Sequence, residues 1–106
     1  MGYFEAGQKK WGRLDGRDLK YQGGFSNNRR EGNGICYYDS GDTYKGEWVN
    51  SKRHGNGMFI NRDGMKFVGN WQNGHRKGEG YLQTESMRIA GNWDKNIIKG
   101  DALIEY

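Results

Sequence analysis

The segment Tyr44-Lys-Gly46-Glu-Trp48, followed seven positions later by Gly55-Asn-Gly57, contains the pattern from which the rest of the chain is built. Three related copies begin with Tyr21-Gln-Gly23-Gly-Phe25, Phe67-Val-Gly69-Asn-Trp71 and Ile89-Ala-Gly91-Asn-Trp93. The copies are 22 or 23 residues apart, and each has its second signature seven positions after the last aromatic residue. Self-similarity at a fixed short period predicts a repeat array, in which each unit stacks on its neighbours.

Each unit has the alternation of two half-buried strands. The alternating aromatic and glycine positions of the second copy are Tyr44, Gly46 and Trp48, then Gly55, Gly57 and Phe59. We expect the two strands to be antiparallel, with Tyr44 opposite Phe59 and the inner glycines opposite each other. Trp48 would then lie opposite Gly55, and the polar residues 49–54 would form the turn between the strands.

Repeated glycines inside strands need a compensating contact, because glycine loses more entropy than other residues and packs nothing. Aromatic rings that cover these glycines from the adjoining strand supply that contact. The dipeptides Ser40-Gly41 and Asp63-Gly64 predict the turns that lead from one hairpin to the next. The residues therefore predict an all-β chain of antiparallel hairpins, with no helix in the array.

The composition is that of one small domain. The chain has 106 residues, 14% aromatic residues and no proline, which suits paired strands because proline cannot donate to their hydrogen bonds. One cysteine excludes an internal disulfide framework, and we interpret Cys36 as a small packing residue. No apolar run approaches the roughly 20 residues that span a bilayer. Residues 1–10 lack a signal-peptide core, so we expect an intracellular protein.

Two further rows of the repeat are apolar, and they point to opposite faces of the predicted strands. The first row is Ile35, Met58, Tyr81 and Leu103, and the second is Cys36, Phe59, Leu82 and Ile104. A single sheet that is apolar on both faces leaves some apolar surface uncovered. This uncovered surface is the main indication of function in the sequence.

The pattern Tyr-x-Gly-x-Trp, then Gly-x-Gly, then a glycine turn at Gly64, closely resembles the MORN-repeat family. The copies at 21–43, 44–66 and 67–88 carry the resemblance, and the copy at 89–106 departs from it with Ile89, Ala102 and Ile97-Ile98. Residues 1–20 resemble the family loosely, as a degenerate N-terminal cap or half-repeat around Trp11. The resemblance implies an elongated, twisted, single-layer antiparallel sheet of tandem β-hairpins, with a groove on its aromatic and glycine face.

Members of that family mostly act as scaffolds and protein-binding modules at cytoskeletal, ciliary or membrane-associated structures, and binding of phospholipid has been proposed for them. The implied partner-binding groove would be lined by Tyr21, Phe25, Tyr44, Trp48, Phe59, Phe67, Trp71 and Trp93. Packing is the larger role that we expect for these rings.

Basic residues of the predicted turns would form one edge of the ribbon: Arg29, Arg30, Lys52, Arg53, Arg76 and Lys77. These cations suit anionic lipid headgroups or acidic protein segments, although solvated turns are the simpler interpretation of a charge run. We do not expect nucleic acid as a partner, because we expect the aromatic residues to cover strand glycines while the basic residues occupy turns. A net charge of +4 permits acidic partners without requiring them.

No set of residues indicates catalysis or a cofactor. His54 and His75 occupy different columns of the repeat, and with a single cysteine they do not make a zinc site. We therefore expect no metal, cofactor or small-molecule substrate, and no enzyme activity of the chain's own. The favoured hypothesis is a scaffold in a larger assembly, whose groove binds a helix or extended segment and whose last strand edge offers a second contact.

Two alternatives stay open. The basic edge would suit an adaptor on anionic membrane, where each Lys or Arg contributes about 1 kcal/mol. The repeats would also suit an accessory subunit that positions a catalytic partner.

Overall fold

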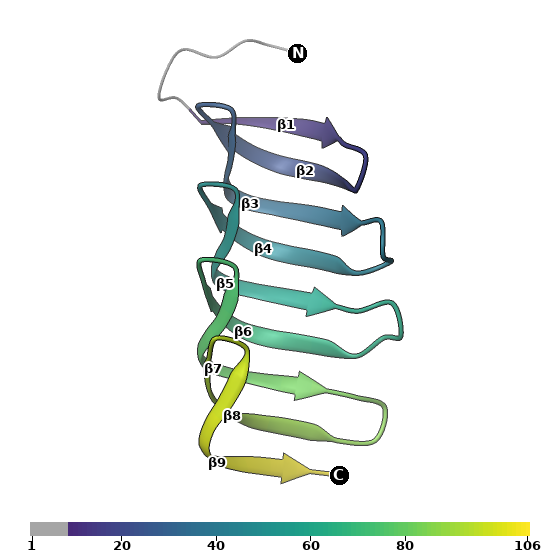
Figure 1. Ribbon diagram of the computed structural model, residues 1–106, viewed down its shortest axis with the longest axis vertical. Coiled ribbons are helices and arrows are strands. Elements are labelled where there is room, and N and C mark those ends of the chain that lie inside the picture. Colours follow the sequence, from purple (N-terminus) through teal and green to yellow (C-terminus); the bar gives the residue numbers. More distant parts are fainter. Residues whose placement is uncertain (1–8) are drawn as a thin grey trace.

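The computed structural model describes residues 9–106, which form one open antiparallel sheet of nine strands and no helix. The strands are β1 (Lys9–Asp15), β2 (Leu19–Ser26), β3 (Arg29–Tyr38), β4 (Thr43–Val49), β5 (Lys52–Ile60), β6 (Lys66–Gln72), β7 (His75–Gln83), β8 (Arg88–Asp94) and β9 (Ile97–Glu105). Their order in the sheet is their order in the chain, so the hairpins stack along one axis (Figure 1). The molecule measures 48 × 24 × 16 Å, and the predicted all-β single layer is confirmed.

The hairpins within the repeats turn on two residues. In each of these turns both residues have positive φ: Asn27-Asn28, Asn50-Ser51, Asn73-Gly74 and Lys95-Asn96. Such turns match the right-handed twist of the flanking strands. The predicted turn over 49–54 is therefore wrong in length, because β4 runs to Val49 and β5 begins at Lys52.

The pairing inside the hairpin is confirmed for Tyr44 with Phe59 and for the inner glycines, but Trp48 lies opposite Arg53 rather than Gly55. A bulge causes the shift, since one residue of β4 faces three residues of β5 between these pairs. Gly55, at the bulge, has a φ of +66° that favours glycine. On its other side, Gly55 pairs in regular register with Trp71 of the next hairpin.

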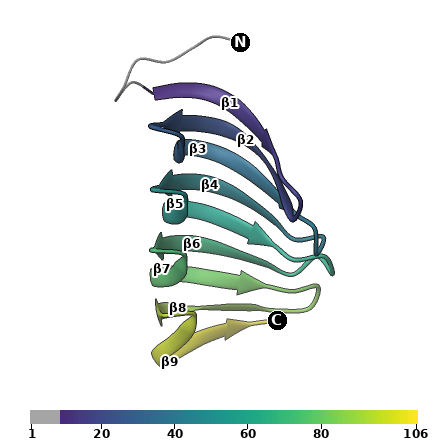
Figure 2. The ribbon, with the colours of Figure 1, turned by 45° about the horizontal axis from the view of Figure 1, so that its top comes forward.

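Bulges of the same size occur in β3, β7 and β9, and such bulges bend and twist the strands that carry them. The sheet is accordingly bowed rather than flat (Figure 2). Successive hairpin tips are joined by backbone hydrogen bonds. Ser51 N donates to Arg30 O over 3.0 Å, Gly74 N to Arg53 O over 2.9 Å, and Asn96 N to Arg76 O over 3.3 Å.

The core is a single line of seven rings on one face of the sheet, which we call the ring face. In contact order they are Phe25, Tyr21, Trp48, Tyr44, Trp71, Phe67 and Trp93. Neighbouring ring centroids are 5.1–5.4 Å apart, and the planes meet edge to face. Such pairs add about 0.5–1.5 kcal/mol each beyond the area they bury. Trp48 and Trp71 each contact the ring of their own hairpin and that of the preceding one, and Trp93 contacts Phe67 of the preceding hairpin, so the line holds the repeats together.

The second glycine of each Gly-x-Gly pair lies directly under a ring, as expected. A Cβ built on Gly57 would lie 2.6 Å from Cε1 of Tyr44, and Phe67 stands in the same relation to Gly80. In the last copy Ile89 replaces the ring and Ala102 replaces the glycine. The two replacements belong together: with Ile89 in place of an aromatic ring, the space next to the strand is free for the methyl group of Ala102.

The register places the two apolar rows on opposite faces, as predicted. The row of Phe59 and Leu82 shares the ring face, whereas the row of Met58 and Tyr81 lies on the other side. Cys36 is fully buried in the core, in keeping with a packing role, and burial raises the pKa of its thiol. Of the predicted N-terminal cap, residues 1–8 lie outside the described residues, and β1 pairs with β2.

Candidate binding groove

Most residues that were predicted to line the groove belong to the core. Tyr21, Tyr44, Trp48, Phe67, Trp71 and Trp93 are each at most 7% exposed, while Phe25 and Phe59 are half-buried. The rings hold the sheet together and offer a partner little direct contact. What a partner can touch is the layer of side chains that lies on top of them.

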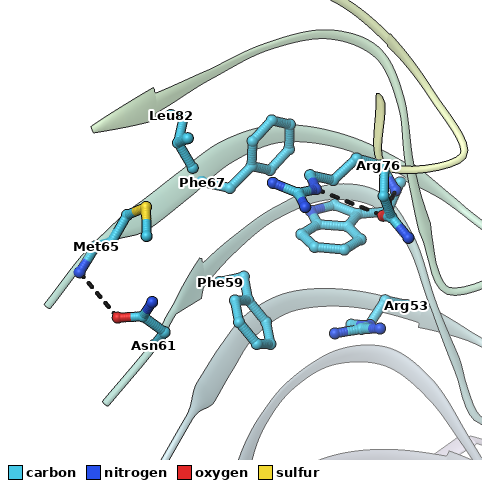
Figure 3. Close-up of a pocket in the computed structure, with 9 residues that line it drawn as sticks. Arg53, Phe59, Asn61, Met65, Phe67, Arg76 and Leu82 are labelled. Carbon is cyan, nitrogen blue, oxygen red and sulfur yellow. Dashed lines mark hydrogen bonds between the residues drawn. The ribbon is translucent and has the colours of Figure 1, made fainter. Parts of the chain in front are cut away.

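That layer leaves an open groove of about 390 Å³ across β5, β6 and β7. Its lining residues are Arg53, Phe59, Asn61, Met65, Phe67, Trp71, Arg76, Leu82 and Asn96. Figure 3 shows Arg53 and Arg76 at one end of the groove and Asn61 and Met65 at the other, with Phe59 and Phe67 between them. The floor is therefore apolar, and one end is cationic.

The predicted basic edge does not exist as a single strip. Arg30, Arg53 and Arg76, which we call the arginine row, lie over the rings. Their guanidinium carbons lie 4.7 Å from the ring centroid of Trp48, 4.8 Å from that of Trp71 and 5.1 Å from that of Trp93, respectively. The two-residue turns explain the placement, because they bring each arginine into the strand on the ring face. Cations above indoles at this distance gain roughly 0.5–2 kcal/mol.

Each arginine of the row also bridges to the next hairpin tip. Arg30 Nη2 donates to Ser51 O over 3.0 Å, and Arg53 Nη2 donates to Gly74 O over 2.8 Å. Arg76 Nε donates to Asn96 Oδ1 over 3.4 Å. The row thus links consecutive repeats, and it uses few of the five N–H donors that each guanidinium carries.

The remaining predicted edge residues, Arg29, Lys52 and Lys77, are exposed. Lys77 forms an ion pair of 3.0 Å with Asp94. The expectation that rings and basic residues occupy separate tracks is wrong for the arginine row, since those three cations lie on the rings.

The charge of the arginine row is not neutralised within the described part of the chain. The ion pairs among residues 9–106 are Arg13 with Asp15 and Lys77 with Asp94, and neither includes the row. Glu47 and Glu79 alternate with ring-face positions and so face the opposite side. Burial, and then the nearby charge of Arg53, lower the pKa of the Arg76 guanidinium from its usual value. The ring face is thus a cationic and apolar surface.

Sequence analysis missed four residues of the groove. Asn61 and Met65 flank the return turn at Gly64. Asn96 lies in a hairpin tip, where its Oδ1 accepts hydrogen bonds from Arg76. Leu82 was recognised as apolar but not as a lining residue. Its position 23 residues after Phe59 was the available signal.

Among residues 9–106, no three His, Cys, Asp or Glu side chains gather closely enough to hold a metal ion. The same residues include no helix of the length and apolar character needed to cross a lipid bilayer.

The indole N–H groups differ between repeats in a way that stability measurements can test. Trp48 Nε1 donates to Gly34 O over 3.3 Å, whereas Trp71 Nε1 is buried without a hydrogen-bond partner among the described residues. Trp48→Phe removes a hydrogen bond, while Trp71→Phe removes a buried unsatisfied donor. We expect Trp48→Phe to lower the free energy of unfolding by about 1–2 kcal/mol more than Trp71→Phe does. Urea unfolding followed by circular dichroism measures both, and equal losses would contradict the assignment.

Comparison with protein-family models matches residues 21–43, 44–66 and 67–84 to the MORN repeat. These repeats are in general non-catalytic and interact with proteins or membrane lipids. A search of the curated proteins found no match to the chain. The copy at 89–106 lies beyond the matched residues, although Trp93 Nε1 donates to Gly80 O over 3.1 Å as Trp48 does to Gly34 O.

Proposed function

Because the chain belongs to the MORN-repeat family, we propose that it is a non-catalytic adaptor that binds a segment of a partner protein in the groove across β5, β6 and β7. One observation carries the proposal. The groove combines an apolar floor at Phe59 and Leu82 with cations at Arg53 and Arg76 that form no ion pair among the described residues. Apolar anchors beside a few charged groups are the usual composition of a specific protein-binding surface.

Anionic lipid is the second class of partner that the family suggests. A flat strip of cations would favour it, because lipid headgroups form a plane. Half of the predicted strip lies over the rings instead, so we place lipid second. A role as an accessory subunit to a catalytic partner is compatible with the same groove and differs only in the identity of that partner.

The chain contains matched pairs of residues for a test, because neighbours in one strand face opposite sides. Phe59→Ser with Leu82→Ser removes the groove floor, and Met58→Ser with Tyr81→Ser makes similar changes on the other face. Peptides selected on the wild-type chain from a random display library would be labelled and titrated against all three proteins. We expect the groove variant to weaken binding about tenfold or more and the control variant to leave it nearly unchanged.

The test can fail in two ways. Selected peptides that bind the groove variant as tightly as the wild type would refute the site. No selectable peptide, together with sedimentation of the chain by anionic but not neutral vesicles, would assign the surface to lipid. Circular dichroism checks that both variants keep the sheet.

A further inference from the structure

The arginine row and the apolar floor of the groove run side by side. Arg53 and Phe59 lie six residues apart in β5, but the guanidinium carbon of Arg53 reaches to 5.4 Å from the ring centroid of Phe59. Arg76 and Leu82 hold the corresponding positions in β7 and line the same groove. Both columns therefore repeat with the hairpins, along the long axis of the molecule. Any occupant that uses both columns must have a charged stripe next to an apolar stripe.

The spacing of the columns restricts the shape of that occupant. Successive arginines of the row are two strands apart, which corresponds to about 10 Å. Side chains seven residues apart on an α-helix are about 10.5 Å apart on one face. In an extended segment, residues on one face recur every ~6.7 Å and do not match. A polyproline II segment repeats at about 9.3 Å, but its three faces lie about 120° apart and do not present two neighbouring stripes.

The charge of the row defines the chemistry of the occupant. Arg30, Arg53 and Arg76 form no ion pair with a carboxylate among residues 9–106, and Glu47 and Glu79 face the other side of the sheet. Arg53 and Arg76 line the same groove, and the charge of Arg53 adds to burial in disfavouring the charge of Arg76. A carboxylate between or above them relieves this repulsion and accepts donors that the hairpin tips leave unused.

We infer that the arginine row binds the carboxylates of an amphipathic helix of a partner protein, with acidic residues at i, i+7 and i+14 beside an apolar stripe that packs on Phe59 and Leu82. The inference rests on the proposed function, since it defines the chemistry of the segment that the groove binds. Each guanidinium keeps its ring beneath it and its bond to the next tip, and presents its remaining N–H donors to the helix.

The probe is a labelled helix-forming peptide with Glu at i, i+7 and i+14 beside a leucine stripe, and its twin with Gln at the three positions. We expect the Glu peptide to bind the wild-type chain at least tenfold more tightly than the Gln peptide, with the difference shrinking in high salt. This comparison uses the wild-type chain, so it tests the inference even if the protein variants do not fold. Equal binding of the two peptides would overturn it.

Variants then locate the contact. The double variant Arg53→Gln with Arg76→Gln is expected to bind the Glu peptide about a hundredfold more weakly than the wild type, or about tenfold for each arginine. Lys52→Gln with Lys77→Gln removes the same charge from the neighbouring exposed positions and is expected to change binding less than threefold. Arg53→Lys with Arg76→Lys keeps a cation above each ring, and it replaces the glutamine variant in the test if that variant loses the sheet. Lysine variants that bind both peptides equally would overturn the inference.

The outcomes separate this inference from the proposed function. Suppose that the Phe59 and Leu82 variant no longer binds the library peptides, while the arginine variant binds the Glu peptide as tightly as the wild type does. The groove is then confirmed as a binding site, and the arginine row has no part in recognition. If neither variant affects any peptide, both proposals fail. Anionic vesicles that bind through the arginine row, with no binding of the Glu peptide, would assign the row to lipid and overturn the inference.

Discussion

Gly57→Ala is expected to lower the free energy of unfolding by about 3 kcal/mol, a large share of the stability of a domain this small. The added methyl group would lie 2.6 Å from Cε1 of Tyr44 and closer still to Cζ and the hydroxyl oxygen. Tyr44 cannot move away, because its ring is held edge to face between Trp48 and Trp71. Urea unfolding followed by circular dichroism measures the loss.

Two further variants serve as controls. Gly16→Ala places its methyl group no nearer than 3.4 Å to Leu19 O at an exposed position, and it is expected to change stability by less than about 0.5 kcal/mol. Tyr44→Ile combined with Gly57→Ala copies the pairing of Ile89 with Ala102 in the last repeat. The double variant should lose less than the sum of the two single losses, because the methyl group then has room. Strictly additive losses would show that the ring is not what excludes the methyl group.

The free energy of unfolding is expected to fall steeply between about pH 10 and pH 12. Burial raises the pKa of Tyr21 to about 12, against an ordinary value of about 10. Between these values the hydroxyl is protonated in the folded chain and ionised in the unfolded chain, so rising pH favours unfolding. The contribution is fully present below pH 10 and falls by about 1.4 kcal/mol per pH unit for each such tyrosine until the folded-state pKa is reached.

Burial also raises the pKa of Tyr38 to about 12 and raises that of Tyr44, so several tyrosines act together. Urea unfolding at intervals from pH 9 to about pH 12 measures the combined slope. Tyr21→Phe should flatten it by about 1.4 kcal/mol per pH unit, while Tyr106→Phe, at a position 94% exposed, should leave it as it is. A wild-type slope in Tyr21→Phe would refute the assignment.

Much of the fold was predictable from the sequence, because its signals are local and periodic. The spacing of Tyr44, Gly46 and Trp48 is that of a strand, and Gly41 and Gly64 mark turns that the structure confirms with φ values of +98° and +92°. The pairing of Tyr44 with Phe59 followed from alternation alone. Each of these features depends on residues within one repeat.

The register near the hairpin tips was not predictable in the same way. Residues 49–54 are polar and fit a long loop equally well, and polarity does not distinguish such a loop from a two-residue turn followed by a bulge. The choice depends on the φ of Asn50, Ser51 and Gly55, which the twist of the assembled sheet favours. For this reason Arg53 was placed in a turn, whereas it belongs to a strand.

The repeat pattern alone thus determines a single sheet of hairpins with rings over glycines, since strand alternation and ring size act over a few residues. The tertiary structure alone decides which side chains lie over the rings. The two-residue turns and the bulges set the register in which Arg30, Arg53 and Arg76 reach the indoles, and the pairing of neighbouring hairpins brings Asn61, Met65 and Asn96 to one groove. The physical reason is that the two-residue turn and the bulge shift the register by two positions, so that Arg53 rather than Gly55 lies opposite Trp48. Whether a basic residue becomes a solvated cation or part of a binding surface therefore depends on pairing between strands, which only the folded sheet sets.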